Sequence, residues 1–134
     1  MGRIEHHVDL LLETESALVT NISKLFGPAF NVWEQDGEIQ INAKGLGNVE
    51  IFEGSIEPGG IALLVSIFVR EELTGTGRML IRKFERACKI ARAHKIMGNA
   101  MGGSDEFWRK MGYKLSRDED PDYEEDNNVF WKDI

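Results

Sequence analysis

The chain has 134 residues, which suits one domain and leaves little room for two. Hydrophobic residues make up 42% of it and charged residues 29%, a composition typical of a soluble globular chain rather than a disordered or membrane protein. The formal net charge of −7 argues against a protein that binds nucleic acid, because the molecule as a whole repels a polyanion. We therefore predict a single globular domain over residues 1–134.

The sequence contains no feature of a membrane or secreted protein. No apolar run approaches the roughly 20 residues that a membrane-spanning helix needs, and the N-terminus lacks the apolar segment of a secretory signal. The single cysteine, Cys88, excludes an internal disulfide and fits a reducing compartment. His6 and His7 have no third ligand spaced near them, so we predict no metal site. We expect a cytoplasmic protein.

The first third of the chain predicts one helix and three strands. Residues 8–27 repeat apolar residues at helical spacing, and Gly27-Pro28 ends the helix. Three short strands follow, over residues 30–35, 38–43 and 48–54. Asp36-Gly37 predicts a two-residue hairpin between the first two strands.

The middle of the chain predicts a buried strand followed by a helix. Residues 61–69, "IALLVSIFV", do not alternate with polar residues, which predicts a central strand covered on both faces. From Gly77 the period changes to that of a helix. Its apolar stripe comprises Leu80, Ile81, Phe84, Ala87, Cys88 and Ala91.

The last third predicts a strand over residues 95–101, a short helix capped by Ser104 and ended by Gly112, and closing strands over 113–116 and 128–134. Between the closing strands lies the acidic stretch "DEDPDYEED". Strands and helices do not alternate as repeated βαβ units, so the fold class is α/β of the mixed α+β kind. Its sheet is mixed and largely antiparallel, with helices on its faces.

The turn between the buried strand and the helix, "TGTGR", is the strongest functional signal. It lacks the Gly-Lys of a phosphate-binding P-loop, and Leu80 replaces the third glycine of a dinucleotide fingerprint. Gly75 and Gly77 nevertheless place side-chain-free N–H groups at a helix N-terminus, where an anion is favoured. Arg78 and Arg82 add positive charge beside them. We interpret the turn as a pyrophosphate cradle, and the alternative is a tight turn with no ligand.

Two charged segments have simpler interpretations as well. The basic face of the helix after Gly77 is most simply solvated surface, with only Arg78 and Arg82 reaching phosphate, and a nucleic-acid interface is the other option. The acidic stretch is a solvated connection or, alternatively, a surface that attracts a cationic amine.

The turn and its surroundings resemble the GCN5-related N-acetyltransferases. That family carries a long strand, the motif [QR]-x-x-G-x-[GA], a helix, a strand, and a second helix ending in Y-x-K-x-G-[FY]. Residues 61–116 are similar to this pattern, through "ELTGTG" and "WRKMGY". The chain departs from it at Glu72, where the family has Gln or Arg, and at Trp108, where it has Tyr.

The resemblance implies acetyl-CoA as the cofactor. In this family two parallel strands separate, and the pantetheine arm lies between them. By position these strands would be residues 61–69 and 95–101. Backbone groups near Ile67 and Val69 would bind the pantetheine amides, and the pyrophosphate would be bound by Thr74, Gly75, Thr76, Gly77 and Arg78.

The implied activity is N-acetyl transfer from acetyl-CoA to a primary amine, which attacks the thioester directly. The candidates for the base that takes the amine proton are Glu50, Glu53 and Glu57, and we choose Glu53. Trp108 would lie near the thioester in place of the family's tyrosine, and its indole N–H cannot deliver a proton at neutral pH. That departure favours the alternative, a catalytically degenerate module of the same fold. The partners expected are acetyl-CoA and an amine acceptor that is cationic if the acidic stretch attracts it, with a homodimer as one option.

Overall fold

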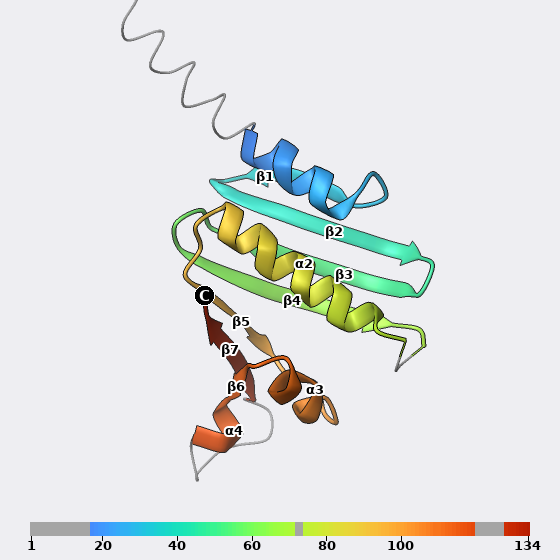
Figure 1. Ribbon diagram of the computed structural model, residues 1–134, viewed down its shortest axis with the longest axis vertical. Coiled ribbons are helices and arrows are strands. Elements are labelled where there is room, and N and C mark those ends of the chain that lie inside the picture. The colour runs from blue at the N-terminus through green and yellow to red at the C-terminus, as the bar shows by residue number, and fades with distance from the viewer. Residues whose placement is uncertain (1–16, 72–73, 120–127) are drawn as a thin grey trace, which may run out of the picture.

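The computed structural model describes residues 17–71, 74–119 and 128–134, and in this part of the chain seven strands form one sheet (Figure 1). The strand order is β1-β2-β3-β4-β5-β7-β6. The strands are β1 (Asn31–Gln35), β2 (Glu38–Leu46), β3 (Val49–Ile56), β4 (Ile61–Val69), β5 (Lys95–Asn99), β6 (Lys114–Leu115) and β7 (Val129–Asp133). The helices are a segment over residues 17–26, α2 (Thr76–Ile90), α3 (Asp105–Lys110) and α4 (Ser116–Glu119).

The first four strands form an antiparallel meander. Asp36 and Gly37 join β1 to β2 with φ angles of 53° and 80°, as the two-residue turn with both central residues left-handed requires. The predicted hairpin is therefore confirmed. β2 is longer than predicted, because it continues through Gly45 and turns only at Gly47 and Asn48.

The second half of the sheet makes it mixed. β5 runs parallel to β4, and α2 forms the connection between them. β7 is antiparallel to both β5 and β6. The predicted mixed, largely antiparallel sheet with flanking helices is thus confirmed.

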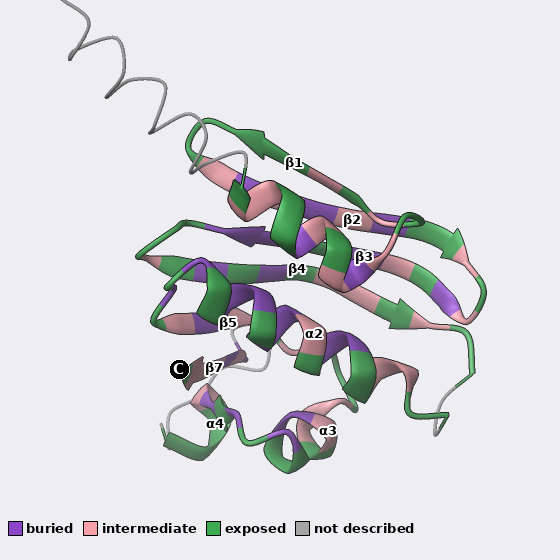
Figure 2. Cartoon of the chain, turned by 45° about the horizontal axis from the view of Figure 1, so that its top comes forward, coloured by how far each residue is buried: buried purple, intermediate pink, exposed green. Residues whose placement is uncertain are grey.

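The core lies between one face of the sheet and two helices, the 17–26 segment and α2 (Figures 1 and 2). Phe52 on β3 is its centre, with ring centroids 5.7 Å from Phe26 and 6.0 Å from Phe84. The predicted apolar stripe of α2 is buried along its whole length, and so is Cys88 within it. Gly54 faces this core, where a Cβ would lie 2.5 Å from the ring of Phe84.

The prediction that the central strand is covered on both faces is wrong for the described residues. Ala62 and Leu64 of β4 are buried against the helices, whereas Ile61, Leu63 and Val65 point the other way and are 38%, 46% and 58% exposed. Both long helical segments lie on one face of the sheet, so nothing in the described ranges packs over this apolar strip. An apolar run without alternation predicted burial, but it did not show which face the helices would cover.

The C-terminal part packs through aromatic residues. Trp108 on α3 stacks on Phe130 of β7 with centroids 3.7 Å apart, and Tyr113 meets both rings edge-on. Gly112 ends the short helix with a φ of 89°, as predicted. Ser104 occupies the N-cap position, but its hydroxyl donates to the carbonyl of Met101 at 2.6 Å rather than capping the helix.

Candidate functional site

The structural feature that a ligand would use is the separation of β4 from β5. The two strands pair from Ile61 with Lys95 to Leu64 with Gly98, and the pairing stops there although β4 continues to Val69. Figure 1 shows β5 running away from β4 toward α3. The backbone polar groups on this edge of residues 65–69 therefore have no strand partner in β5 and are free to pair with a ligand.

A bulge marks the place where β4 leaves β5. Glu53 of β3 pairs with Ser66 and Gly54 pairs with Leu64, so Val65 is an extra residue in β4. A bulge bends its strand and increases the local twist. Ile67 and Val69, which the sequence analysis proposed as backbone contacts, lie beyond the bulge, in the stretch of β4 that pairs with β3 but not with β5.

The glycine turn lies at the open end of this gap. Gly75 is left-handed with a φ of 83°, and the position of its missing Cβ faces open space. Gly77 has a different role, because its missing Cβ would lie 3.5 Å from the ring of Phe107 on α3. The first helical bond of α2 runs from the N–H of Met79 to the carbonyl of Gly75, at 3.0 Å. The N–H groups of residues 76–78 consequently have no acceptor within the helix.

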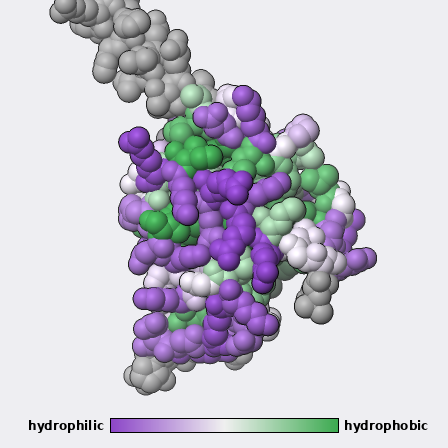
Figure 3. Space-filling view, viewed as in Figure 1, coloured by the Kyte–Doolittle hydropathy of each residue, from purple (hydrophilic) through white to green (hydrophobic). Residues whose placement is uncertain are grey.

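Of the two arginines expected to bind phosphate, Arg82 is paired with a carboxylate and only Arg78 is available. The Arg82 guanidinium lies 2.8 Å from the carboxylate of Glu85, one turn along α2, and is directed to that partner. Arg78 is exposed and forms no ion pair among the described residues. Figure 3 shows hydrophilic side chains across the outer face of α2, which is consistent with solvated surface.

Thr74 and Thr76 are held by a residue that sequence reasoning missed. Asn48, on the hairpin between β2 and β3, donates to the hydroxyls of Thr74 and Thr76 at 2.8 and 2.9 Å and also contacts Glu71. No local pattern signals this contact, because Asn48 precedes these residues by 23 to 28 positions. Glu72, a departure from the family motif, lies outside the described residues.

The candidate base Glu53 lies on the uncovered face of the sheet. Its neighbours Phe52 and Gly54 point into the core, and Glu53 itself is exposed next to Ser66. It is therefore one strand away from the point where β4 and β5 separate. The structure brings Glu53 near the gap but places it on the opposite side of the sheet from the helices.

Trp108 is a packing residue in this structure. Its side chain is 3% exposed and contacts Phe107, Tyr113 and Phe130. The prediction that the indole lies near a thioester stays a prediction, and the buried stack leaves it little surface for a ligand. Tyr113, the motif's last aromatic residue, is buried as well, and its hydroxyl donates to Glu85 at 3.3 Å.

Glu85 is a buried carboxylate. Its burial could not be predicted from the sequence, because it lies among the basic residues of α2. It accepts from Lys132 on β7 at 2.8 Å as well as from Arg82 and Tyr113. Burial, followed by the nearby charge of Glu85, raises the pKa of the Tyr113 hydroxyl and raises that of the Cys88 thiol to about 12. Neither group is therefore suited to donating or accepting a proton at neutral pH.

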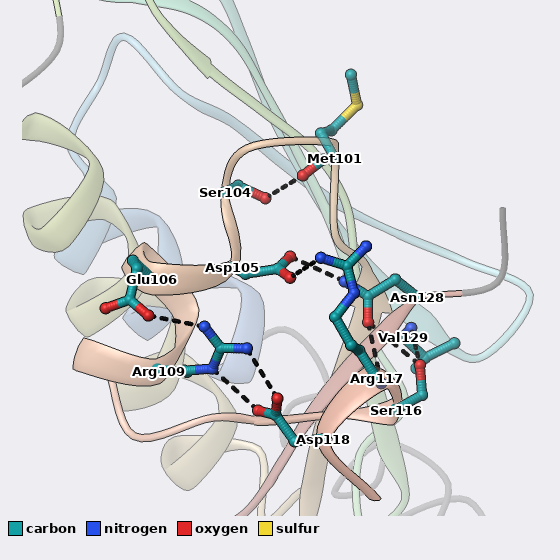
Figure 4. Close-up of polar contacts among 10 residues, drawn as sticks. All are labelled: Met101, Ser104, Asp105, Glu106, Arg109, Ser116, Arg117, Asp118, Asn128 and Val129. Carbon is teal, nitrogen blue, oxygen red and sulfur yellow. Dashed lines mark hydrogen bonds and ion pairs between the residues drawn. The ribbon is translucent and has the colours of Figure 1, made fainter. Parts of the chain in front are cut away.

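The beginning of the acidic stretch is bound to α3 (Figure 4). The Arg109 guanidinium donates two hydrogen bonds to the carboxylate of Asp118, at 2.8 and 3.0 Å, which lowers the pKa of Asp118. Asp105 accepts from Arg117 at 2.8 Å and from Asn128 at 2.9 Å. Residues 120–126 of the stretch lie outside the described residues, so the predicted attraction of an amine is not tested there.

None of the described helices combines the length and apolarity that crossing a bilayer requires. In the same residues, no group of three His, Cys, Asp or Glu side chains is arranged to hold a metal ion.

The comparisons with known proteins establish the fold. No protein-family model and no curated protein matches the chain. Ard1 from Thermoplasma volcanium matches with a TM-score of 0.51 and 16% identity, over 88% of this chain and 78% of that one. An acetyltransferase from Streptococcus agalactiae matches with a TM-score of 0.53 and 19% identity, over 73% and 68%.

Elp3 from Methanocaldococcus infernus, lacking its N-terminal residues, matches with a TM-score of 0.55 and 19% identity. The match covers 78% of this chain but only 29% of Elp3. At such identities the likeness is one of fold. It confirms the GCN5-related N-acetyltransferase fold that the sequence resemblance predicted.

Proposed function

We propose that this protein is an acyl-CoA-dependent N-acyltransferase that uses acetyl-CoA and a primary amine. The observation that carries the proposal is the gap between β4 and β5. Two parallel strands pair over four positions and then separate, and a glycine turn at the N-terminus of a 15-residue helix lies at the open end. An extended chain with amide groups fits the unpaired strand edge, and a pyrophosphate fits the helix N-terminus.

The residues at the turn fit the anionic part of CoA. The N–H groups of residues 76–78 have no helical acceptor and would donate to the pyrophosphate, with the Arg78 guanidinium beside them. Thr74 and Gly75 complete the turn, and the open space at Gly75 lets a ligand approach the backbone. A helix N-terminus contributes typically 0.3–1 kcal/mol to a charge at an exposed site, so several donors acting together are required.

The residues along β4 would bind and orient the rest of the donor. Backbone groups near Ile67 and Val69 would pair with the pantetheine amides, as a neighbouring strand would. When bound, acetyl-CoA supplies an acyl group activated as a thioester. Backbone N–H groups of β4 would donate to its carbonyl oxygen, where negative charge develops during attack.

The acceptor amine would approach from the uncovered face of the sheet, where Glu53 lies beside the bulge. Glu53 would accept the proton that the amine loses, directly or through a water molecule. Acidic residues 118–126 would attract a cationic amine. If they do, kcat/KM should fall as the salt concentration rises, since exposed charges are screened over about 10 Å at 0.1 M salt.

A second function has one observation in its favour. The Trp108 side chain is buried in an aromatic stack, and an indole cannot deliver a proton to a leaving thiolate. A protein that binds CoA without transferring the acyl group would not need a proton donor at this position. Both functions require the glycine turn to bind CoA, and they differ only in turnover.

The first experiment tests CoA binding by calorimetry with three proteins. Gly77→Glu adds a negative charge next to the N–H groups of residues 76–78 that would bind the pyrophosphate, and its Cβ meets the Phe107 ring at an ordinary 3.5 Å, so the fold should tolerate it. Gly77→Ala is the matched control, which adds the Cβ without the charge. We expect Gly77→Glu to abolish CoA binding and Gly77→Ala to weaken it less. Unchanged affinity in a folded Gly77→Glu variant would refute the cofactor assignment.

The second experiment separates the two functions. Thiol release from acetyl-CoA is measured with a panel of amines that includes a polyamine, a lysine peptide and a peptide with a free N-terminus. An enzyme releases CoA with at least one amine, and Glu53→Gln lowers that rate with CoA affinity unchanged. Tight CoA binding without release for any amine favours the binding module.

A further inference from the structure

We propose that Asn48 is a positioning residue for the CoA site, holding the glycine turn in the form that binds pyrophosphate. The inference rests on the proposed function and extends it to a residue outside the family motif. Asn48 lies on the hairpin between β2 and β3, at the same end of the sheet as the turn. Its side chain contacts three residues of the turn and its approach.

The Asn48 amide pairs with the backbone of Glu71 as a strand residue would. Its Nδ2 lies 3.0 Å from the carbonyl oxygen of Glu71, and its Oδ1 accepts from the Glu71 N–H at 2.6 Å. The orientation of the amide follows from these partners. The reversed amide would put an oxygen against the carbonyl and an NH₂ group against the N–H.

The Asn48 pairing extends the sheet beyond its last strand residues. The β3–β4 ladder ends with Val49 opposite Val69, and the Arg70 N–H then donates to the carbonyl of Asn48 at 2.8 Å. The side-chain pair with Glu71 continues the ladder by one more residue. The backbone of Glu71, which precedes the turn, therefore forms hydrogen bonds with the sheet instead of with water.

The same amide group also holds the hydroxyl groups of Thr74 and Thr76 in place. Nδ2 lies 2.8 Å from Thr74 Oγ1 and 2.9 Å from Thr76 Oγ1, and these oxygens are 3.0 Å apart. Because Nδ2 only donates and its two protons are shared among these two oxygens and the Glu71 carbonyl, the hydroxyl protons must point away from it. Thr74 donates to the Glu71 carbonyl at 3.1 Å, which leaves the Thr76 proton to donate to Thr74 or to an incoming phosphate oxygen.

This arrangement makes a specific demand on residue 48. Its side chain must direct the two protons of one NH₂ group at three neighbouring oxygens and accept from one N–H. An aspartate would keep the acceptor but turn a carboxylate toward those oxygens and toward the bound anion. An alanine would remove all four contacts. In the alanine variant the turn loses its side-chain attachment to the β2–β3 hairpin, and in the aspartate variant the carboxylate repels the Glu71 carbonyl and a bound anion, while the strands themselves remain.

The test compares two ligands, CoA and S-acetylpantetheine, which lacks both the pyrophosphate and the nucleotide. Dissociation constants are measured by NMR titration, which reaches the millimolar range, for wild type, Asn48→Ala, Asn48→Asp and Asn31→Ala. Asn31→Ala is the matched control, because Asn31 donates to Asn42 at 2.9 Å on the exposed edge of the sheet. We expect Asn48→Ala and Asn48→Asp to weaken CoA binding tenfold or more and S-acetylpantetheine binding less than twofold.

Three outcomes would overturn the inference. CoA affinity in Asn48→Ala equal to that in Asn31→Ala would overturn it and leave the proposed function standing. A loss of affinity by the same factor for both ligands would mean that Asn48 supports the fold in general. A wild-type protein that binds neither ligand would overturn both the inference and the proposed function.

Discussion

Replacing Gly98 by alanine should destabilise the fold at the point where β4 and β5 separate. A Cβ on Gly98 would lie 2.6 Å from the backbone oxygen of Leu64 and 2.5 Å from Cζ of Phe130. Both distances fall short of ordinary contact by about 0.8 Å or more, so the strand or the ring must move. Phe130 is 1% exposed and stacks on Trp108, which leaves it no free space.

The cost of Gly98→Ala can be estimated from two opposing effects. Overpacking a filled core typically costs about 1–3 kcal/mol, whereas replacing glycine by alanine gains about 0.4–1 kcal/mol by restricting the unfolded chain. The net loss in the free energy of unfolding should be about 1–2 kcal/mol. For a chain of this length that lowers Tm by about 3–10 °C.

The assay is thermal unfolding followed by circular dichroism, with Gly102→Ala as the matched control. A Cβ on Gly102 would meet nothing within 4 Å, and its φ is not left-handed, so that variant should melt at or slightly above the wild-type temperature. The near-ultraviolet spectrum of Gly98→Ala should also change, since Phe130 must move against Trp108. Coincident melting curves for the two variants would refute this reasoning.

Two further predictions concern buried polar groups. The pKa of the Cys88 thiol is raised to about 12, so the folded protein should resist an aromatic disulfide reagent at pH 8, and rapid reaction without unfolding would contradict the assignment. The folded state retains the thiol proton above the ordinary pKa of 9.0, so the stability linked to this proton is complete below pH 9 and is lost between pH 9 and about 12. In urea unfolding, Cys88→Ala should therefore reduce the fall of the free energy of unfolding with pH over that range. Glu85→Gln should lower the free energy of unfolding by about 1–3 kcal/mol, because Lys132 and Arg82 lose a charged partner. Glu106→Gln, whose pair with Arg109 is at the surface, should cost about 0–1 kcal/mol, and equal costs for the two variants would show that the burial of Glu85 contributes nothing.

The sequence by itself determined the glycine turn and most of the elements, although not α4 or the full length of β2. The apolar stripe of α2 follows from a period of 3.6 residues, and the hairpin at Asp36-Gly37 follows from the left-handed conformation that these residues tolerate. The ends of β4 and the stop at Gly112 were also predictable. These features depend on residues a few positions apart, so a single sequence contains their physical cause.

Only the tertiary structure decided how distant segments meet. The burial of Glu85 depends on Lys132 and Tyr113 arriving from other elements, and a basic helix face gave no indication of it. Trp108 aligned with a family tyrosine, yet stacking on Phe130 determined where its indole lies. The attachment of the turn to Asn48 spans 23 to 28 residues, and it exists because the β2–β3 hairpin and the end of β4 lie side by side in the sheet. Contacts of this kind arise from strand register and packing, which no local pattern of residues specifies.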